Sequence, residues 1–164
     1  MAQAGTIAIS RFKQLLVAET GLTTAMKVLA DFTGSAADEI LERQVTSHQI
    51  AFDLEEKTAG AKYPSFHIYC DRISNTLREK FRTFSGTVQL NAEVRVSQDR
   101  LDGIDTILHR HVDGLTYVLD QNRGDWGSGM HYAGGYDITF QPIKHGGKNF
   151  LQSAKIIFAV HVSL

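Results

Sequence analysis

Residues 87–97 read TVQLNAEVRVS, and this stretch decides the fold. Apolar and polar side chains alternate along it without a break. Alternation with a period of two buries one face of a β-strand and leaves the other face to water. We therefore predict a long strand over residues 87–97, with these apolar residues on its buried face: Val88, Leu90, Ala92, Val94 and Val96.

The pattern changes to helical spacing directly after this strand. Between residues 100 and 121 the apolar side chains recur at intervals of three and four, which is typical of an amphipathic helix. The apolar positions are Leu101, Ile104, Ile107, Leu108, Val112, Leu115, Val118 and Leu119. We predict that this helix covers one face of the sheet to which residues 87–97 belong.

Three further segments alternate in the same way, at residues 66–70, 136–140 and 154–163. The last two are joined by a segment with Gly146 and Gly147 at its bend, which indicates a long β-hairpin. We expect helical turns at residues 73–82 and a loop at the glycine-rich residues 123–135. The chain is thus predicted to be an α+β protein with a four-stranded, mainly antiparallel sheet packed by the long amphipathic helix.

The N-terminal part has a different pattern. Helices are predicted over residues 7–18, 24–31 and about 35–45, while residues 46–58 fit a strand or a helix equally well. The segment TAGAKYP (58–64) is small and ends in a proline, which is typical of a linker. The predicted division is an N-terminal helical region (1–60) and an α+β domain (61–164).

Composition excludes several functional classes. The 164 residues carry a formal net charge of −1, so no basic surface predicts strong nucleic-acid binding. Cys70 is the only cysteine, which rules out a disulfide within the chain. The sequence has no signal-peptide pattern and no apolar run of membrane-spanning length, so we expect a soluble protein made in the cytosol, without a membrane partner.

The sequence gives only weak evidence for catalytic or metal-binding residues. Asp105, His109 and Asp113 have a spacing of four that can place metal ligands on one helix face. The same spacing is usual on a solvated polar face, which we favour. Ser128 lies in no nucleophile motif, and the glycine clusters do not match a phosphate-binding loop. We predict no enzyme activity, no cofactor and no metal.

The loop between the last two predicted strands is the better candidate for a partner surface. Its two lysines would release few counterions, which argues against nucleic acid. An aromatic side chain in a polar loop can anchor a protein interface, or it can fold back into its own core. The predicted interface residues are Trp126, Lys144, His145, Lys148, Asn149 and Phe150.

Residues 63–164 resemble the small neck and tail proteins of long-tailed bacteriophages, and most closely the tail terminator family. The resemblance is carried by KFRTFSG (80–86) leading into the long strand and by VDGLTYVLD (112–120) at the end of the helix. The final hairpin, GGY followed by GGKNF, adds to it. These motifs are architectural rather than catalytic, and the first 60 residues have no counterpart in the resemblance.

The resemblance implies a fold and a function. Tail terminators have a four-stranded, mainly antiparallel sheet with flanking helices and form a ring of six subunits. The ring caps the head-proximal end of the tail tube, stops its growth and offers a surface to the head stopper or connector. DNA passes through the lumen without being read, and no cofactor is involved. The expected location is the virion tail or neck, with assembly in the host cytoplasm.

Three alternatives remain open at this point. The first is a metal-dependent enzyme that would use His109 and its neighbours. A neighbouring neck role, as a tail completion or head–tail connector protein, would use the same kind of ring. A binding module or chaperone of unrelated origin would use only the loop surface. A ring subunit needs two different patches, one for each neighbour, and long hairpins with an open sheet edge can supply them.

Overall fold

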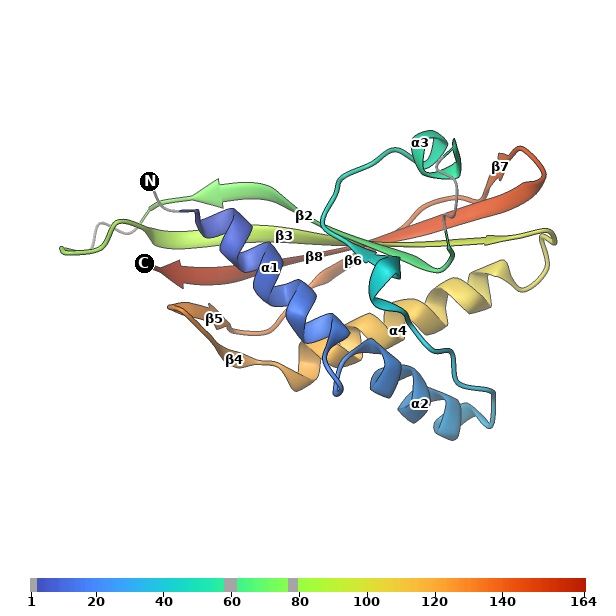
Figure 1. Cartoon of the computed structure of the whole chain (residues 1–164), viewed down its shortest axis with the longest axis horizontal. Coiled ribbons are helices and arrows are strands. Elements are labelled where there is room, and N and C mark those ends of the chain that lie inside the picture. The colour runs from blue at the N-terminus through green and yellow to red at the C-terminus, as the bar shows by residue number, and fades with distance from the viewer. Residues whose placement is uncertain (1–2, 58–61, 77–79) are drawn as a thin grey trace.

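The computed structural model describes residues 3–57, 62–76 and 80–164. Its helices are α1 (Ala4–Val17), α2 (Leu22–Thr33), α3 (Phe52–Lys57) and α4 (Ile104–Gln121). Its strands are β1 (Val45–Thr46), β2 (Ser65–Ser74), β3 (Ser85–Gln98), β4 (Gly124–Gly127), β5 (Met130–Tyr132), β6 (Asp137–Phe140), β7 (Lys144–Gly146) and β8 (Asn149–Ser163). Figure 1 shows an elongated molecule in which α1, α2 and α4 lie to one side of the sheet.

The prediction of a four-stranded, mainly antiparallel sheet is wrong. The described residues form an eight-stranded sheet in the order β1-β2-β3-β8-β5-β4, and β6 and β7 also pair with β8. The sheet is mixed, because β1 runs parallel to β2 while the remaining pairs are antiparallel. The long central strands β3 and β8 pair along their whole length, from Ser85 opposite Ser163 to Gln98 opposite Phe150.

Two of the additional strands, β5 and β7, arise because short segments line up with β6 along one edge of β8. β5 lies opposite residues 161–162, β6 opposite residues 154–157 and β7 opposite residues 149–151. Gly134 and Gly135, both with positive φ, lie between β5 and β6, and Pro142 lies between β6 and β7. Alternation predicts β6, at residues 136–140, but segments of three residues such as β5 and β7 are too short for it to reveal.

The predicted helices at residues 7–18, 24–31 and 100–121 are confirmed as α1, α2 and α4, with shifted ends. The helix predicted at residues 35–45 is wrong. Residues 35–41 are irregular and lead into one 3₁₀ turn at Glu42–Gln44. The Ile40 N–H donates to Thr23 Oγ1 at 3.3 Å, and the Leu41 N–H donates to Gln44 Oε1 at 2.8 Å. These backbone N–H groups therefore bond to side chains and not to the backbone carbonyls that a helix would offer them.

Two other local predictions are also wrong. Residues 123–135, expected to be a loop, contain the β4–β5 hairpin, whose turn has positive φ at Gly127, Ser128 and Gly129. Ile73, expected in a helical turn, lies in β2. Residues 77–79 of that predicted turn and residues 58–61 of the predicted linker lie outside the described residues.

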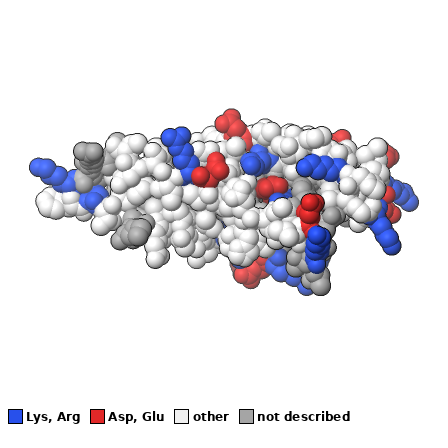
Figure 2. Space-filling view, turned by 90° about the horizontal axis from the view of Figure 1, so that it is seen from above, with Lys and Arg blue, Asp and Glu red and all other residues white. Residues whose placement is uncertain are grey.

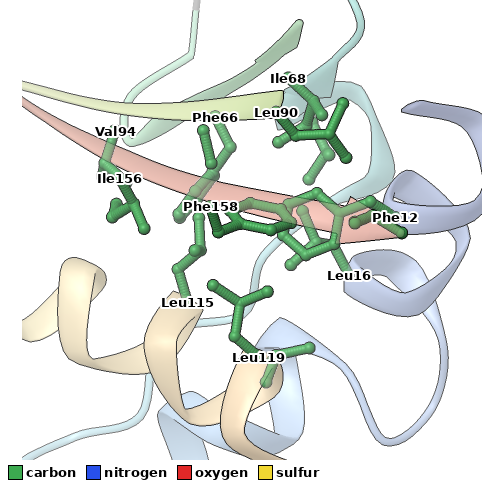
Figure 3. Close-up of a cluster of buried hydrophobic side chains, with 14 of the residues drawn as sticks. Phe12, Leu16, Phe66, Ile68, Leu90, Val94, Leu115, Leu119, Ile156 and Phe158 are labelled. Atoms are coloured by element: carbon green, nitrogen blue, oxygen red, sulfur yellow. The ribbon is translucent and has the colours of Figure 1, made fainter. Parts of the chain in front are cut away.

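One hydrophobic core lies between the sheet and the helices. Its members come from α1, α2, α4 and the strands β1 to β5 and β8, so residues from the N-terminal 60 share the core of the sheet. Figure 3 shows side chains from α1, β2, β3, α4 and β8 pointing toward one another, among them Phe12, Leu16, Phe66, Leu90, Leu115, Leu119 and Phe158. The even-numbered positions of β3 supply its core face, as the alternation of residues 87–97 predicts.

None of the helices in the described part of the chain combines the length and apolarity needed to cross a membrane.

Candidate functional site

The predicted interface loop forms the β7–β8 hairpin. Lys144, His145, Lys148 and Asn149 are exposed, and they are brought together at the hairpin tip, where Gly146 pairs with Asn149 and Gly147 takes a φ of 58°. Phe150 is half-buried and packs against the core and, edge to face, against His145 at 5.4 Å between ring centroids. The hairpin therefore presents two lysines, an imidazole and an amide, with Phe150 beneath them.

Trp126 lies elsewhere and is a core residue of this chain, with 3% exposure. Its ring stacks on Phe12 with 5.7 Å between centroids and lies 5.5 Å from Tyr132. Its Nε1–H donates to the carbonyl of Asn122 at 2.6 Å. Because β5 pairs with residues 161–162 of β8 and the hairpin tip lies at residues 146–149, Trp126 and the tip are separated by roughly 40 Å at about 3.4 Å per residue.

Two of the open strand edges of the sheet differ in character. On one side, β1 covers only Phe66 and His67 of β2, so within the described residues no strand pairs with the outer edge of β2 from Ile68 to Ser74. On the other side, β6 pairs only with β8, and all four of its residues are exposed. Apolar side chains lie at both edges: Ile73 (52% exposed) on β2, and Ile138 (37%) and Phe140 (39%) on β6.

The candidate metal residues Asp105, His109 and Asp113 are exposed on the polar face of α4. His109 Nδ1 donates to the backbone carbonyl of Asp105 at 2.7 Å, and its ring stacks on Phe140 with 4.4 Å between centroids. Among the residues that the structure describes, no three His, Cys, Asp or Glu side chains are arranged to hold a metal ion. The spacing of four on this helix face therefore does not bring Asp105, His109 and Asp113 together as metal ligands in the described structure.

A buried charge cluster lies where α3 meets the face of the sheet opposite the helical layer. Arg95 of β3 donates through Nη1 to Glu55 Oε2 at 2.8 Å and through Nε to Glu93 Oε1 at 3.0 Å. His67 donates through Nε2 to Glu55 Oε1 at 2.9 Å, and Arg95 Nη2 also donates to the carbonyl of Ile50. These bonds fasten residues 50–55 to the sheet.

Burial tends to raise the pKa of Glu55, but hydrogen bonds from His67, Ser65 and Arg95 outweigh it and lower that pKa from 4.5 to about 2. The carboxylate is therefore charged at neutral pH. Ser65, His67 and Glu55 are all buried, and Ser65 Oγ also lies 3.2 Å from Nε2 of His67. Thr46 Oγ1 lies 2.9 Å from Nδ1, so the imidazole has a hydroxyl on one nitrogen and the Glu55 carboxylate on the other. Because the His67 ring is buried and the Glu55 carboxylate also accepts from Arg95, these bonds hold the buried cluster together.

A cavity of about 340 Å³ lies between residues 38–44, residues 62–64 just before β2, the end of β3 and α4. His111 of α4 is 1% exposed and lines it, together with Asp38, Glu39, Lys62 and Arg110. His111 Nδ1 donates to the carbonyl of Ile107 at 2.8 Å, and Nε2 lies 3.3 Å from Asp38 Oδ2. Burial lowers the pKa of His111, which favours the neutral ring.

Sequence reasoning missed both polar sites, although a signal existed for one. His111 stands three residues after Leu108 and four before Leu115, so it falls within the apolar stripe of the helix and was open to prediction as a buried histidine. Glu55 lies in residues 46–58, for which the pattern allowed both strand and helix. Its partner Arg95 alternates as an outward-facing residue of β3, and nothing local indicates that α3 covers it.

Comparison of the chain with protein-family models and with curated protein sequences finds no match.

Proposed function

We propose that this protein is a ring-forming structural subunit of a phage tail, and that the ring caps the head-proximal end of the tail tube as a tail terminator does. The observation that supports it most is the pair of open, non-equivalent edges on opposite sides of one sheet. A subunit with two different complementary edges assembles head to tail, and such contacts close into a ring when the rotation between subunits allows it.

The two edges suit this assembly chemically. An open strand edge presents unpaired backbone donors and acceptors, and pairing with another strand satisfies them. In the proposed ring, the β2 edge of one subunit pairs with the β6 edge of the next. Ile73 on the first edge then meets the apolar side chains of Ile138 and Phe140 on the second, which are partly exposed in the single chain.

The charge distribution is compatible with a channel that DNA passes without adhering. The formal net charge is −1, and Figure 2 shows acidic and basic side chains interspersed over the side of the molecule that it displays. Strong adhesion to a phosphate backbone requires a concentration of Lys and Arg, because affinity grows with each phosphate neutralised. The β7–β8 hairpin tip supplies the contact to the tail tube or to the head stopper.

A neighbouring neck role, as a tail completion or head–tail connector protein, uses the same two edges and differs only in the partner below the ring. The two roles are separated by mixing the protein with terminator-deficient tail tubes of its own phage and imaging the mixture by electron microscopy. A terminator caps one end of each tube and arrests its length. Free tubes beside unattached protein would exclude the terminator role.

The edge pairing has its own test. Ile138→Lys places a charge at the β6 edge and should abolish rings or tube caps without changing the circular dichroism spectrum. Thr106→Lys adds the same charge on the exposed face of α4 and should leave assembly intact. Native mass spectrometry and electron microscopy give the readout. Normal assembly by the Ile138→Lys variant would show that β6 is not a subunit interface.

A further inference from the structure

Phe81 is a fully exposed aromatic residue with a strained backbone. Its exposure is 103%, so no part of its own chain buries the ring. Its φ of 68° lies in the left-handed region, which is a genuine outlier for a bulky residue. Strain of this kind clusters at binding and switch regions, where it is part of the function. The exposed ring and its strained backbone together indicate a contact outside the single chain.

Phe81 lies in the turn that leads into β3, at one end of the sheet. Lys80 and Arg82 flank it in the sequence and are exposed, so the aromatic ring stands between two cationic residues. The Phe84 N–H donates to the carbonyl of Leu164 at 3.2 Å, which ties the base of this turn to the end of β8. In Figure 1 the turn projects past the end of the sheet, on the side where β2 forms the open edge.

A pocket of about 530 Å³ lies at the opposite edge, in the gap between β5 and β6. β5 pairs with residues 161–162 of β8 and β6 pairs with residues 154–157, so no described strand lies opposite residues 158–160 on that side. The volume falls within the range of about 300–1,000 Å³ that is usual for pockets that bind a small organic group. An aromatic side chain therefore fits into it.

The lining of this pocket matches an aromatic ring that has a cation beside it. Tyr136, Ile157 and Ala159 supply apolar surface, and Asp137 adds an exposed carboxylate. Aromatic anchors that fill apolar pockets contribute most to many protein interfaces, and opposite charges beside them fix the register. The turn offers the anchor in Phe81 and the opposite charge in Lys80.

The turn and the pocket lie on the two edges that the proposed ring brings together. Phe81 follows the end of β2 in the sequence, and the pocket lies where β6 begins at Asp137. When β2 of one subunit lies antiparallel to β6 of the next, the chain that continues past Ser74 runs toward the residues that precede Asp137. The proposed edge pairing thus directs the turn of one subunit toward the pocket of its neighbour.

We infer that Phe81 inserts into the pocket between β5 and β6 of a second copy of this chain, with Lys80 facing the partner subunit's Asp137. The inference rests on the proposed ring, because it uses the same two edges. Both halves of the contact occur on one chain and do not overlap, so the contact is head to tail and repeats from subunit to subunit. A buried phenylalanine adds about 150–250 Å² to an interface that the strand edges alone leave narrow.

Disulfide trapping tests the placement directly. Phe81→Cys and Ala159→Cys are combined in the full-length Cys70→Ser protein, so that the two new thiols are the only ones. Oxidation should link subunits into a ladder above the dimer on a non-reducing gel, because each subunit is joined to two neighbours. The control combines Phe32→Cys with Ala159→Cys, since Phe32 is 91% exposed at the end of α2. The control should give no ladder above the dimer.

Phe81→Gly separates assembly from folding. Glycine adopts a φ of 68° without strain, so the melting temperature should not fall, while assembly in sedimentation velocity should require roughly tenfold more protein. Lys80→Asp should also weaken assembly, and adding Asp137→Lys should restore it. Phe32→Ala removes another exposed aromatic ring and should assemble as the wild type does.

The outcomes separate this contact from the proposed function. Rings without a ladder above the dimer would overturn the inference and leave the ring standing. A ladder from a protein that does not cap tail tubes would support the contact and count against the terminator role. A monomer that gives no ladder, or a Phe81→Gly variant that assembles normally and fails only to bind tail tubes, would overturn the inference, the latter by assigning Phe81 to the tube.

Discussion

Glu55 should be the residue that makes this fold sensitive to acid. Its carboxylate is buried between Arg95 and His67, and its pKa is lowered from 4.5 to about 2 by hydrogen bonds that outweigh the effect of burial. A folded-state pKa below the unfolded value means that the charged form stabilises the fold. That stabilisation is complete above about pH 4.5 and is lost as the pH falls toward 2.

The magnitude follows from the two pKa values. A tenfold change in proton affinity corresponds to about 1.4 kcal/mol, so the drop from 4.5 to about 2 corresponds to about 3 kcal/mol. Removing one partner of a buried ion pair costs a similar 3–5 kcal/mol or so, because the other charge stays buried. Glu55→Gln keeps the shape and removes the charge, so we expect it to lower the free energy of unfolding at pH 7 by about 3 kcal/mol.

The assay is urea unfolding followed by circular dichroism at pH 7 and at pH 3. The free energy of unfolding of the wild type should fall between pH 7 and pH 3. The fall should be smaller for Glu55→Gln, because this variant lacks the carboxylate whose stabilising contribution is mostly lost over that range. Glu42→Gln removes an exposed carboxylate of the 3₁₀ turn and controls for net charge. Parallel pH profiles for wild type and Glu55→Gln, or equal stability at pH 7, would refute the argument from the buried cluster.

Three further predictions concern packing. Trp126→Ala should lower the free energy of unfolding by about 3–5 kcal/mol in a urea titration, because Trp126 is buried against Phe12 and Tyr132; a near-neutral result would show that the ring does not belong to the core. Gly86→Ala should cost about 1–3 kcal/mol, because the new Cβ would lie 1.9 Å from the carbonyl oxygen of Ser74. Gly5→Ala should cost less in the same urea titration, since its Cβ meets the end of the Ile73 side chain at 3.0 Å, and an equal loss would contradict the backbone clash. Phe150→Ala should lower the melting temperature only slightly, since the ring is half-buried, and a loss as large as that of Trp126→Ala would place Phe150 fully in the core.

Some of the candidate sites are built from residues close together in the sequence, and others from residues far apart in it. The exposed hairpin tip at Lys148 and Asn149 follows from two adjacent glycines and a polar run, so the sequence predicts it directly. The buried clusters around Glu55 and His111 depend on partners far away in the chain: Glu55 contacts Arg95, 40 residues on, and Arg110 contacts Asp38, 72 residues back. A charged side chain is buried when another part of the chain packs over it, and the sequence pattern around that residue does not show which part does so.

The sequence by itself determined the long elements of this protein. β3 has fourteen residues and α4 has eighteen, so each repeats its pattern of apolar and polar side chains several times. A pattern of that length fits either a strand or a helix but not both, so β3, α4 and most of β8 are predictable from the order of side chains. Only the tertiary structure decided the rest. The short strands β1, β5 and β7 exist because longer neighbouring strands offer them free backbone groups, and β4 forms as the hairpin partner of β5. Residues 35–41 stay non-helical where Thr23 and Gln44 bind the backbone N–H groups of Ile40 and Leu41. In segments of two to four residues, local preference is smaller than the energy of a few hydrogen bonds made with the remainder of the fold.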